Sequence, residues 1–388
     1  MGQIYSIRTM NEISPIINDI LDKGYTVSSE VEEPDALIVR SAELKGYKRG
    51  PKLSAIARAG AGVNNIPIDE CSAEGIVVFN TPGANANAVA ELVIAAMLMT
   101  GRDIIGGAEW VRTLKGQENI GKLVEKEKSR FTGPELRGKS LGVIGLGAVG
   151  GLVANAASAL GMEVYGYDPF VSVEHVWALS RSIHRVTDRE ELIRRSDYIS
   201  LHVPLIEETK GLFDGGMFAR MKQGATLLNF SRGELVDCEA VVEAVGSGRL
   251  RAYATDFPCE GMLGVAGIVS LPHLGASTPE SEENCARMAA EELRDFLEFG
   301  VIRNSVNLPD VDLPRTMGGR VTVVHRNVPN MISTIAGVMG GDNVNIEHMT
   351  NKSRGNMAYT ALDIAGSLTQ GQVDRLTSLE GVLRVRLF

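Results

Sequence analysis

The sequence predicts an α/β protein with two doubly wound domains built on parallel sheets, followed by a smaller module with the element order βαββαβ. Short apolar runs alternate with helical stretches through residue 316, as parallel sheets covered by helices require. The pattern changes after residues 307–314, where Pro309 and Pro314 block helix continuation and indicate a linker. A chain of 388 residues has room for two or three such domains.

The first domain is predicted to be discontinuous and to consist of residues 1–88 and 277–316. Its expected strands and first helix are residues 4–7, 26–28, 36–39 and 55–59, and residues 15–22. Residues 279–299 form a long acidic helix with alanines and leucines on one face, and we expect this helix to return the chain to the first domain.

Residues 88–100 form an apolar run that contains Glu91. A membrane span needs about 20 residues, so we interpret this shorter run as a buried core helix. The N-terminus lacks a basic segment followed by a long apolar one, as a signal peptide would have, and we expect a cytoplasmic protein.

The most specific local pattern is the glycine-rich turn at residues 143–151, VIGLGAVGG, between a predicted strand and a predicted helix, residues 149–160. Gly145 permits a tight turn, Gly147 lets backbone amides approach a pyrophosphate, and Gly150 lets the helix pack closely. The helix N-terminus favours the anion.

Asp168 follows the next apolar strand, where its carboxylate accepts hydrogen bonds from a ribose diol and repels a 2′-phosphate. Residues 89–276 are therefore predicted to form a Rossmann-like domain that binds NAD rather than NADP. Its strands are expected at residues 140–144, 164–167, 198–202, 226–229, 252–255 and 268–270.

Residues 317–388 are predicted to form a ferredoxin-like βαββαβ module. Its expected strands and helices are residues 320–325, 344–349, 357–364 and 382–387, and residues 331–339 and 372–379. So small a sheet exposes an edge, and we expect a partner subunit to cover it.

The composition excludes several classes of function. A net charge of −9 argues against nucleic acid or an anionic membrane as a partner. The four cysteines, Cys71, Cys238, Cys259 and Cys285, are scattered, which predicts reduced thiols, no disulfide framework and no metal site.

Three residues after predicted strands suit hydride-transfer chemistry. Arg232 can fork onto a substrate carboxylate, although a surface arginine in a loop is the more common reading. His273 suits a general acid/base, although a loop histidine bonded to backbone is the more common interpretation in isolation. Glu260 could orient the His273 imidazole or could be a solvated acid.

These motifs, with Ser200-Leu-His-Val-Pro204, Asn229-Phe-Ser-Arg-Gly233 and Pro272-His-Leu-Gly-Ala-Ser277, resemble those of the D-isomer-specific 2-hydroxyacid dehydrogenases. The tail Val324-His-Arg-Asn-Val-Pro329 resembles an ACT regulatory domain. The combination implies NAD-dependent oxidation of 3-phospho-D-glycerate to 3-phosphohydroxypyruvate, the first step of phosphorylated L-serine biosynthesis. A reductase of glyoxylate, hydroxypyruvate or another 2-oxoacid is an alternative, as is an NAD-sensing protein-binding module.

The resemblance implies that Arg232, Glu260 and His273 form the catalytic set. Asp256 and Glu260 lie one residue closer together than in related enzymes, which puts Glu260 in doubt. The cofactor-binding residues that the resemblance implies are Gly145, Gly147, Ala148, Val149, Gly150, Asp168, His202, Val203, Pro204, Thr209, Ser231, Asp256, His273 and Gly275.

The same resemblance assigns a set of substrate-gripping positions, most of them in the first domain. They are Arg40, Ser41, Gly62, Val63, Asn85, Lys128 and Arg232. Cations and glycine-loop amides suit a substrate with two anionic ends.

In the tail, His325, Asn327 and Asn345 match the family's serine-binding positions, so feedback inhibition by L-serine is a hypothesis. An asparagine amide can pair with the carboxylate and amine of an amino acid, and such sites form between two ACT domains. Asn330 replaces the glycine usual after Pro329, and asparagine tolerates the positive φ of such a turn. We expect a homodimer or a homotetramer.

Overall fold

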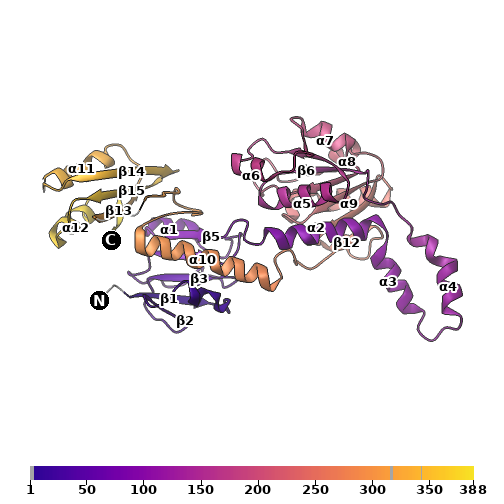
Figure 1. Cartoon of the computed structure of the whole chain (residues 1–388), viewed down its shortest axis with the longest axis horizontal. Coiled ribbons are helices and arrows are strands. Elements are labelled where there is room, and N and C mark those ends of the chain that lie inside the picture. Colours follow the sequence, from indigo (N-terminus) through magenta and orange to yellow (C-terminus); the bar gives the residue numbers. More distant parts are fainter. Residues whose placement is uncertain (1–3, 315–317, 342) are drawn as a thin grey trace. The chain divides into compact units, whose positions relative to one another are not determined.

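The structure, a computed structural model, describes residues 4–314, 318–341 and 343–388. The chain divides into two compact units, Met1–Asn85 together with Pro279–Phe388, and Ala86–Thr278 (Figure 1). The predicted three-domain division remains a prediction, and its boundary at residues 316 and 317 lies outside the described residues.

The first unit contains a parallel sheet of five short strands in the order β2-β1-β3-β4-β5. The strands are β1 (Tyr5–Met10), β2 (Tyr25–Ser28), β3 (Ala36–Val39), β4 (Ala55–Arg58) and β5 (Val77–Asn80). Residues 15–22, predicted as a helix, form only the short 3-10 helix η1 (Pro15–Asp19), because the chain turns back into β2 soon afterwards.

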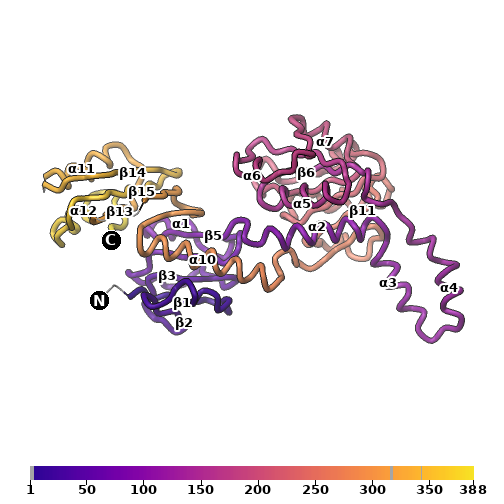
Figure 2. Tube along the Cα trace, viewed as in Figure 1, coloured from indigo at the N-terminus to yellow at the C-terminus, as the bar shows by residue number. Residues whose placement is uncertain are grey.

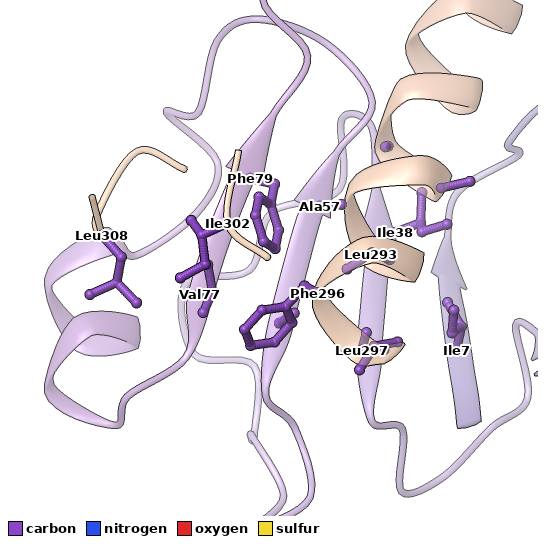
Figure 3. Close-up of a cluster of buried hydrophobic side chains, with 14 of the residues drawn as sticks. Ile7, Ile38, Ala57, Val77, Phe79, Leu293, Phe296, Leu297, Ile302 and Leu308 are labelled. Atoms are coloured by element: carbon purple, nitrogen blue, oxygen red, sulfur yellow. The ribbon is translucent and has the colours of Figure 1, made fainter. Parts of the chain in front are cut away.

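Helix α10 (Pro279–Phe299) covers one face of this sheet, although it is far from the strands in sequence (Figure 2). Its residues Leu293, Phe296 and Leu297 pack on Ile38 and Phe79 (Figure 3). The opposite face carries Leu37 and Val39 and is closed by Cys71 of α1 (Ile68–Ala73) and by neighbouring loops. Alternate residues of each strand therefore enter different cores, as period-two side chains require.

The second unit contains a parallel sheet of seven strands in the order β12-β11-β10-β9-β6-β7-β8. They are β6 (Ser140–Ile144), β7 (Glu163–Tyr167), β8 (His184–Arg185), β9 (Tyr198–Leu201), β10 (Ala225–Asn229), β11 (Leu250–Thr255) and β12 (Ile268–Ser270). The order reverses between β6 and β9, which is the topological switch point at which open α/β sheets bind ligands.

Helices cover both faces of the seven-stranded sheet. The face with Val143 packs on α2 (Ala86–Gly101) and α5 (Ala148–Ala159). The face with Ile144 packs on α7 (Arg189–Arg195), α8 (Gly215–Arg220) and α9 (Cys238–Gly246). The predicted doubly wound sheet is confirmed, and so is the buried core helix, in which Val93, Ala96 and Met97 of α2 are fully buried. In the described residues no helix is long and apolar enough to cross a membrane.

A helical excursion between α2 and β6 was not predicted. It consists of α3 (Ile104–Thr113), α4 (Ile120–Glu127) and the 3-10 turn η2 (Lys128–Phe131). Among the described residues α3, α4 and η2 contain no buried side chain, and Leu114, directly after α3, is buried. A ring contact of 5.5 Å between Trp110 and Phe131 joins α3 to η2. Three short elements, α6 (Val173–Ala178), η3 (Gly233–Leu235) and η4 (Glu260–Met262), complete the unit.

The C-terminal residues form an antiparallel sheet in the order β14-β15-β13-β16, in the same unit as the five-stranded sheet. The elements are β13 (Gly319–Arg326), α11 (Met331–Gly341), β14 (Ile346–Arg354), β15 (Met357–Ile364), α12 (Gln370–Thr377) and β16 (Val382–Leu387). This sequence of elements is the predicted βαββαβ order.

Both faces of this antiparallel sheet are covered. Val321 and Val323 pack on α11 and α12, whereas Val324 and Tyr359 join the core that contains α10. The segment predicted as a linker is also anchored, because the Asn307 side chain hydrogen-bonds to the backbone of Ile76 and Val78.

The cysteines contradict the predicted reduced thiols. Cys238, at the start of α9, and Cys259, directly before η4, form a disulfide with their Cα atoms 6.6 Å apart. They lie 21 positions apart in the sequence, and they meet because α9 and η4 pack against each other. Cys71 and Cys285 are free and buried.

Candidate active site

The predicted cofactor and catalytic residues follow strands of the seven-stranded sheet. The parallel register aligns Ile144 with Tyr167 and Leu201, Leu201 with Asn229, and Thr255 with Asn229 and Ser270. Because all these strands run in one direction, the residues that follow them lie along one carboxyl edge. We call this edge of the sheet the carboxyl edge.

The glycine-rich turn leaves β6 at the centre of the carboxyl edge. Gly145 has a φ of 93°, and a Cβ there would collide with the His202 carbonyl. A Cβ at Gly150 would collide with the Gly145 carbonyl, whereas no atom lies within 4 Å of a Cβ built at Gly147. Two glycines are therefore required by packing, and the third opens the backbone at the N-terminus of α5 to an approaching group.

Asp168 lies directly after β7 with both carboxylate oxygens engaged by backbone amides. Oδ2 accepts from the Leu146 N–H at 2.8 Å and Oδ1 from the Phe170 N–H at 2.8 Å. The first bond ties this acid to the glycine-rich turn, so the two parts of the fingerprint are held together.

His202 follows β9, next to the same turn. Its Nε2 lies 2.8 Å from Ser200 Oγ, and burial lowers the pKa of this histidine to about 4, so its ring is neutral at physiological pH. Pro204 and Thr209 belong to the exposed loop that follows, in which the Thr209 hydroxyl donates to the Pro204 carbonyl at 2.6 Å.

Arg232 projects from a turn that is fixed by internal hydrogen bonds. Ser231 Oγ donates to the Leu201 carbonyl at 2.6 Å, and Asn229 Nδ2 donates to the Arg232 carbonyl at 2.8 Å. The Arg232 side chain itself is exposed, and among the described residues it donates only to the neighbouring Ser231 carbonyl. The backbone of this turn is rigid, while its guanidinium retains donors for an anion.

Asp256 is a buried carboxylate at the end of β11. Its Oδ2 accepts from the Gly275 N–H at 3.1 Å, whereas Oδ1 has no hydrogen-bond partner among the described residues. Burial raises the pKa of Asp256, and the Gly275 N–H and the charge of His273 act in the opposite direction. A buried acceptor without a partner is costly, so this oxygen is prepared for a donor from a ligand.

Phe257 connects the two predicted catalytic segments. Its ring centroid lies 4.6 Å from that of His273, and its Cβ lies 3.2 Å from a Cβ built at Gly233, the residue after Arg232. The structure therefore brings the Arg232 turn and His273 to one aromatic side chain.

Glu260 is not brought to His273. It lies exposed on η4, and in the described part of the chain no hydrogen bond or ion pair joins it to His273. The charge of His273 instead acts on Asp256, where it opposes the increase of the carboxyl pKa that burial causes.

These features fit a dinucleotide. The open backbone at Gly147 and the N-terminus of α5 suit a pyrophosphate, and the carboxylate of Asp168 suits a ribose diol. Ala148 and Val149 begin α5, and Val203 extends the loop after β9. The orphaned Asp256 Oδ1 accepts a hydrogen bond, which suits an amide donor on the ligand.

The first unit has its own cationic edge, formed by residues after β3 and at the end of β4. Arg40 follows β3 and pairs with Glu282 of α10 at 2.7 Å, and Arg58 Nε donates to the Arg40 carbonyl at 3.1 Å. The amides of Ser41 and Ala42 donate to Asn11 Oδ1 at 3.1 and 2.8 Å. Two guanidinium groups therefore belong to neighbouring strands at one edge.

Other predicted substrate residues lie on loops. Gly62 and Val63 are half-buried after β4, and Asn85 is the last residue of its unit before α2. Lys128 lies on η2 and forms an ion pair with Glu125 at 2.5 Å, with its side chain 63% exposed. Lys128 therefore has a partner on its own helical excursion.

The predicted effector residues are divided between two ends of the antiparallel sheet. His325 is buried near the end of β13, with Nδ1 2.8 Å from the Arg326 carbonyl and Nε2 2.8 Å from Thr360 Oγ1. Asn327 Nδ2 donates to the Gly355 carbonyl at 3.1 Å.

Asn345 lies at the opposite end of this sheet. It precedes β14, and its carbonyl accepts from the Ala365 N–H, next to the pairing of Gly319 with Ile364. Six residues of β13 separate Gly319 from His325, which is a length of about 20 Å at the rise of a strand. Asn330 has a φ of 66°, so the positive φ expected at this position is confirmed.

Sequence reasoning missed Arg58 and Glu282. Arg58 is the last residue of β4 and pairs in register with Val39, the residue before Arg40. A cation at the end of a strand, two residues before Gly60, could have identified it from the sequence. Glu282 carried no local signal, because α10 is more than 200 residues away from Arg40. Within the described residues no group of three or more histidine, cysteine, aspartate or glutamate side chains could hold a metal ion.

A family model described as "D-isomer specific 2-hydroxyacid dehydrogenase, NAD binding domain" matches residues 94–275. A D-3-phosphoglycerate dehydrogenase of Methanocaldococcus jannaschii is 36% identical over 291 residues, which cover 73% of this chain and 53% of the relative. A D-3-phosphoglycerate dehydrogenase of Haemophilus influenzae is 32% identical over 349 residues, which cover 87% of this chain and 82% of the relative.

A crystal structure of NAD+-bound 3-phosphoglycerate dehydrogenase from Entamoeba histolytica is 30% identical to this chain with a TM-score of 0.60. The match covers 78% of this chain and 99% of the other. Several of the curated relatives are considerably longer, and the chain spans about half the length of the Methanocaldococcus protein.

Proposed function

The chain belongs to the D-isomer-specific 2-hydroxyacid dehydrogenases and carries their NAD-binding domain, and we propose that it oxidises 3-phospho-D-glycerate to 3-phosphohydroxypyruvate. The single observation that supports the activity is that the Arg232 turn and His273 both pack against Phe257, at the edge that carries the dinucleotide fingerprint. The names of the curated relatives support the choice of substrate.

In this proposal His273 is the general base that takes the C2 hydroxyl proton, and it returns that proton in the reverse direction. Arg232 holds the substrate carboxylate with donors that the chain leaves uncommitted. Bound NAD supplies the hydride acceptor. Phe257 keeps the His273 ring and the Arg232 turn in a constant relation, so both groups act on one substrate.

The cofactor is proposed to occupy the carboxyl edge of the seven-stranded sheet. Gly147, Ala148 and Val149 would hold the pyrophosphate, and Asp168 the adenosine ribose. Asp256 Oδ1 would accept from the nicotinamide carboxamide, which would satisfy a buried oxygen that otherwise lacks a partner. His202, Val203, Pro204, Thr209, Ser231 and Gly275 complete the proposed cofactor site.

The substrate phosphate is proposed to bind the first unit. Arg40 and Ser41 remain the leading residues, and Arg58 joins them because its guanidinium lies against the Arg40 backbone. Gly62, Val63 and Asn85 would supply backbone and amide contacts. Lys128, which belongs to the second unit and pairs with Glu125, stays a predicted substrate contact. Two guanidinium groups favour a phosphorylated acid over glyoxylate or pyruvate.

The substrate proposal is tested by following NADH absorbance with 3-phosphohydroxypyruvate, hydroxypyruvate, glyoxylate and pyruvate. We expect the highest kcat/KM with the phosphorylated acid. Equal or greater kcat/KM with an unphosphorylated acid would instead identify a general 2-oxoacid reductase. NADH binding without turnover of any of the four acids would indicate an NAD-sensing binding module.

Arg58→Met sharpens this test, because it removes one cation and leaves the acid/base group untouched. We expect a higher KM for 3-phosphohydroxypyruvate and little change with glyoxylate, which lacks the phosphate. A KM that rises equally for both acids would contradict a phosphate contact at this edge.

The C-terminal βαββαβ sheet is proposed to be an ACT module that binds L-serine between two copies of the chain. Support comes from the separation of Asn345 from His325 and Asn327, because one module cannot bring these residues to one amino acid. In a second module related by a two-fold axis, the end of the sheet that carries Asn345 would lie against the end of the first module's sheet that carries His325 and Asn327. The site then requires at least a homodimer.

A further inference from the structure

The disulfide between Cys238 and Cys259 lies beside a residue of the proposed catalytic set. Cys259 directly precedes Glu260, and Cys238 is the first residue of α9. Both cysteines are half-buried, whereas Cys71 and Cys285 are buried and unbonded. Small-molecule reductants can therefore reach this bond more readily than the other two thiols.

The bond joins Glu260 to a well-fixed part of the fold. Asp237 caps α9 by accepting from the Ala240 N–H at 2.9 Å, and Val241 of the same helix is fully buried. Gly261, next to Glu260, lies close to Cys238 Sγ, which is 3.8 Å from a Cβ built at the glycine. The disulfide therefore holds η4 against the start of α9.

With the bond formed, Glu260 does not engage the proposed base. Its side chain is exposed, and within the described residues no hydrogen bond or ion pair connects it to His273. His273 instead packs on Phe257 and interacts with the charge of Asp256, whose Oδ2 is already bonded to the Gly275 N–H. The proposed carboxylate–histidine pair is incomplete in this state.

We propose that the Cys238–Cys259 disulfide is a redox switch that withholds Glu260 from His273, and that its reduction completes the pair. A dithiol reductant gives two electrons and two protons to the bond, which becomes two thiols, while the reductant closes to its own disulfide. Small-molecule disulfides reverse the step. This inference rests on the proposed role of His273 as the acid/base group and on the pairing of Glu260 with His273 that the family resemblance implies.

Reduction frees η4 from α9, and the segment from Phe257 to Glu260 can then carry the carboxylate toward the imidazole. A carboxylate within about 4–6 Å of an imidazole favours its charged form and moves its titration upward by about one pH unit or more. Reduction of a 2-oxoacid needs the protonated ring as the acid. The reduced enzyme therefore remains active to higher pH than the oxidised enzyme. At a pH above the midpoints of both pH profiles, its kcat/KM is about tenfold higher.

The test compares the full-length chain in a dithiol buffer and after oxidation with a small-molecule disulfide, with thiols counted by mass spectrometry. The measurements are kcat/KM for 3-phosphohydroxypyruvate as a function of pH, and the NMR titration of the His273 ring, assigned with His273→Gln. The switch variant is Cys238→Ser/Cys259→Ser. The matched control is Cys71→Ala/Cys285→Ala, which removes two thiols that take no part in the bond.

We expect oxidation to move the alkaline limb and the His273 titration down by about one pH unit in wild type and in the control variant. The switch variant should have the pH profile and the His273 titration of the reduced wild type in both buffers. Adding Glu260→Gln to the switch variant should move both back to the values of the oxidised wild type. Identical pH profiles and His273 titrations in the two redox states of wild type would overturn the switch. Faster turnover after oxidation would overturn its direction.

The two proposals fail separately. If none of the acids is turned over in either redox state, the proposed function is wrong, while the His273 titration still decides the switch without any substrate. If 3-phosphohydroxypyruvate is turned over equally well in both states with unchanged titrations, the function stands and the switch does not.

Discussion

In the seven-stranded sheet all strands run in the same direction, whereas in the four-stranded sheet β13 runs antiparallel to both of its neighbours. Residues that follow the parallel strands, such as Asp168, His202 and Asp256, consequently share one edge. The predicted effector residues His325 and Asn345 instead lie at opposite ends of the antiparallel sheet.

This difference explains which sites one chain can complete. Motifs placed after strands converge automatically in a parallel sheet, because every strand ends at the same edge. In the four-stranded sheet β13 and β14 also run in one direction, because both pair antiparallel with β15. His325 lies near the end of β13, however, and Asn345 precedes the start of β14, so one module holds these two residues at opposite ends of the sheet. The proposed cofactor site is therefore internal, and the proposed serine site is shared.

The largest expected effect comes from removing the proposed acid/base group at the carboxyl edge. His273→Gln should lower kcat with 3-phosphohydroxypyruvate by about 10²–10⁴-fold, because general acid–base catalysis contributes about that much. NADH should still bind, as measured by its fluorescence. The control is His348→Gln, an exposed position on β14. Near-normal turnover by the His273 variant would remove this residue from the mechanism.

In the antiparallel sheet we expect a substitution to lower the free energy of unfolding and to leave turnover unchanged. Arg320 and Asp363 form a buried pair between β13 and β15, with Nε 2.6 Å from Oδ1 and both side chains 3% exposed. Asp363→Ala should cost about 3–5 kcal/mol in urea unfolding, because it leaves an arginine charge buried without its partner.

The double variant Arg320→Met/Asp363→Leu tests the cause of that loss. It removes both charges and should recover much of the stability, since an apolar pair of similar volume often replaces a buried ion pair without cost. A double variant as unstable as Asp363→Ala would point to the Arg320 bonds with the Phe299 and Pro314 carbonyls.

Substitutions at two glycines of the fingerprint are expected to have different effects at the carboxyl edge, one on packing and the other on ligand binding. Gly150→Ala places a methyl on the Gly145 carbonyl and should cost about 1–3 kcal/mol of stability. Gly147→Ala meets no atom within 4 Å and should leave the melting temperature unchanged while weakening NADH binding. If Gly147→Ala binds NADH normally, the pyrophosphate does not approach this turn.

The proposed effector site between two copies is tested by mixing two variants, each of which is expected to lose inhibition by L-serine. Asn327→Ala and Asn345→Ala should each abolish inhibition by L-serine without changing kcat. Co-expressed chains should regain part of the inhibition, because a mixed pair retains one site in which neither asparagine is replaced. Failure of the mixture to respond, when each variant still pairs normally, would contradict a site between two copies.

The smallest expected effect concerns acid stability at the carboxyl edge. The pKa of His202 is lowered by burial to about 4, whereas an unfolded chain's histidine has a pKa of about 6.5. Between these values the unfolded state binds more protons, so stability falls as the pH falls. His202→Gln should flatten this loss in melting curves recorded between pH 7 and pH 4. An unchanged slope would show that His202 does not contribute.

Much of the fold could be predicted because each element is encoded by residues close to one another in sequence. The strand at residues 140–144 and the helix at residues 279–299 are predicted at their observed limits. Both carry strong apolar patterns, continuous in the buried strand and one-sided in the helix. Helices α3 and α4 were missed because their residues bury little, so apolar periodicity carries little information there.

In the candidate site, too, residues within a local motif could be predicted, whereas contacts between distant segments could not. The residues after the parallel strands needed only local patterns, because strand direction then places them together. The contact of Arg40 with Glu282 and the bond between Cys238 and Cys259 join segments with no common local pattern. Glu260 was expected beside His273, yet the position of its turn is decided by how η4 packs on α9.

The sequence by itself determined the α/β class, the glycine-rich turn with Asp168, and the order of catalytic candidates along the chain, because these depend on neighbours within one or two elements. The tertiary structure alone decided which cysteines meet, whether Glu260 bonds to His273, and which effector residues are separated. Those outcomes depend on strand direction and on the packing of distant elements, and no local pattern encodes them.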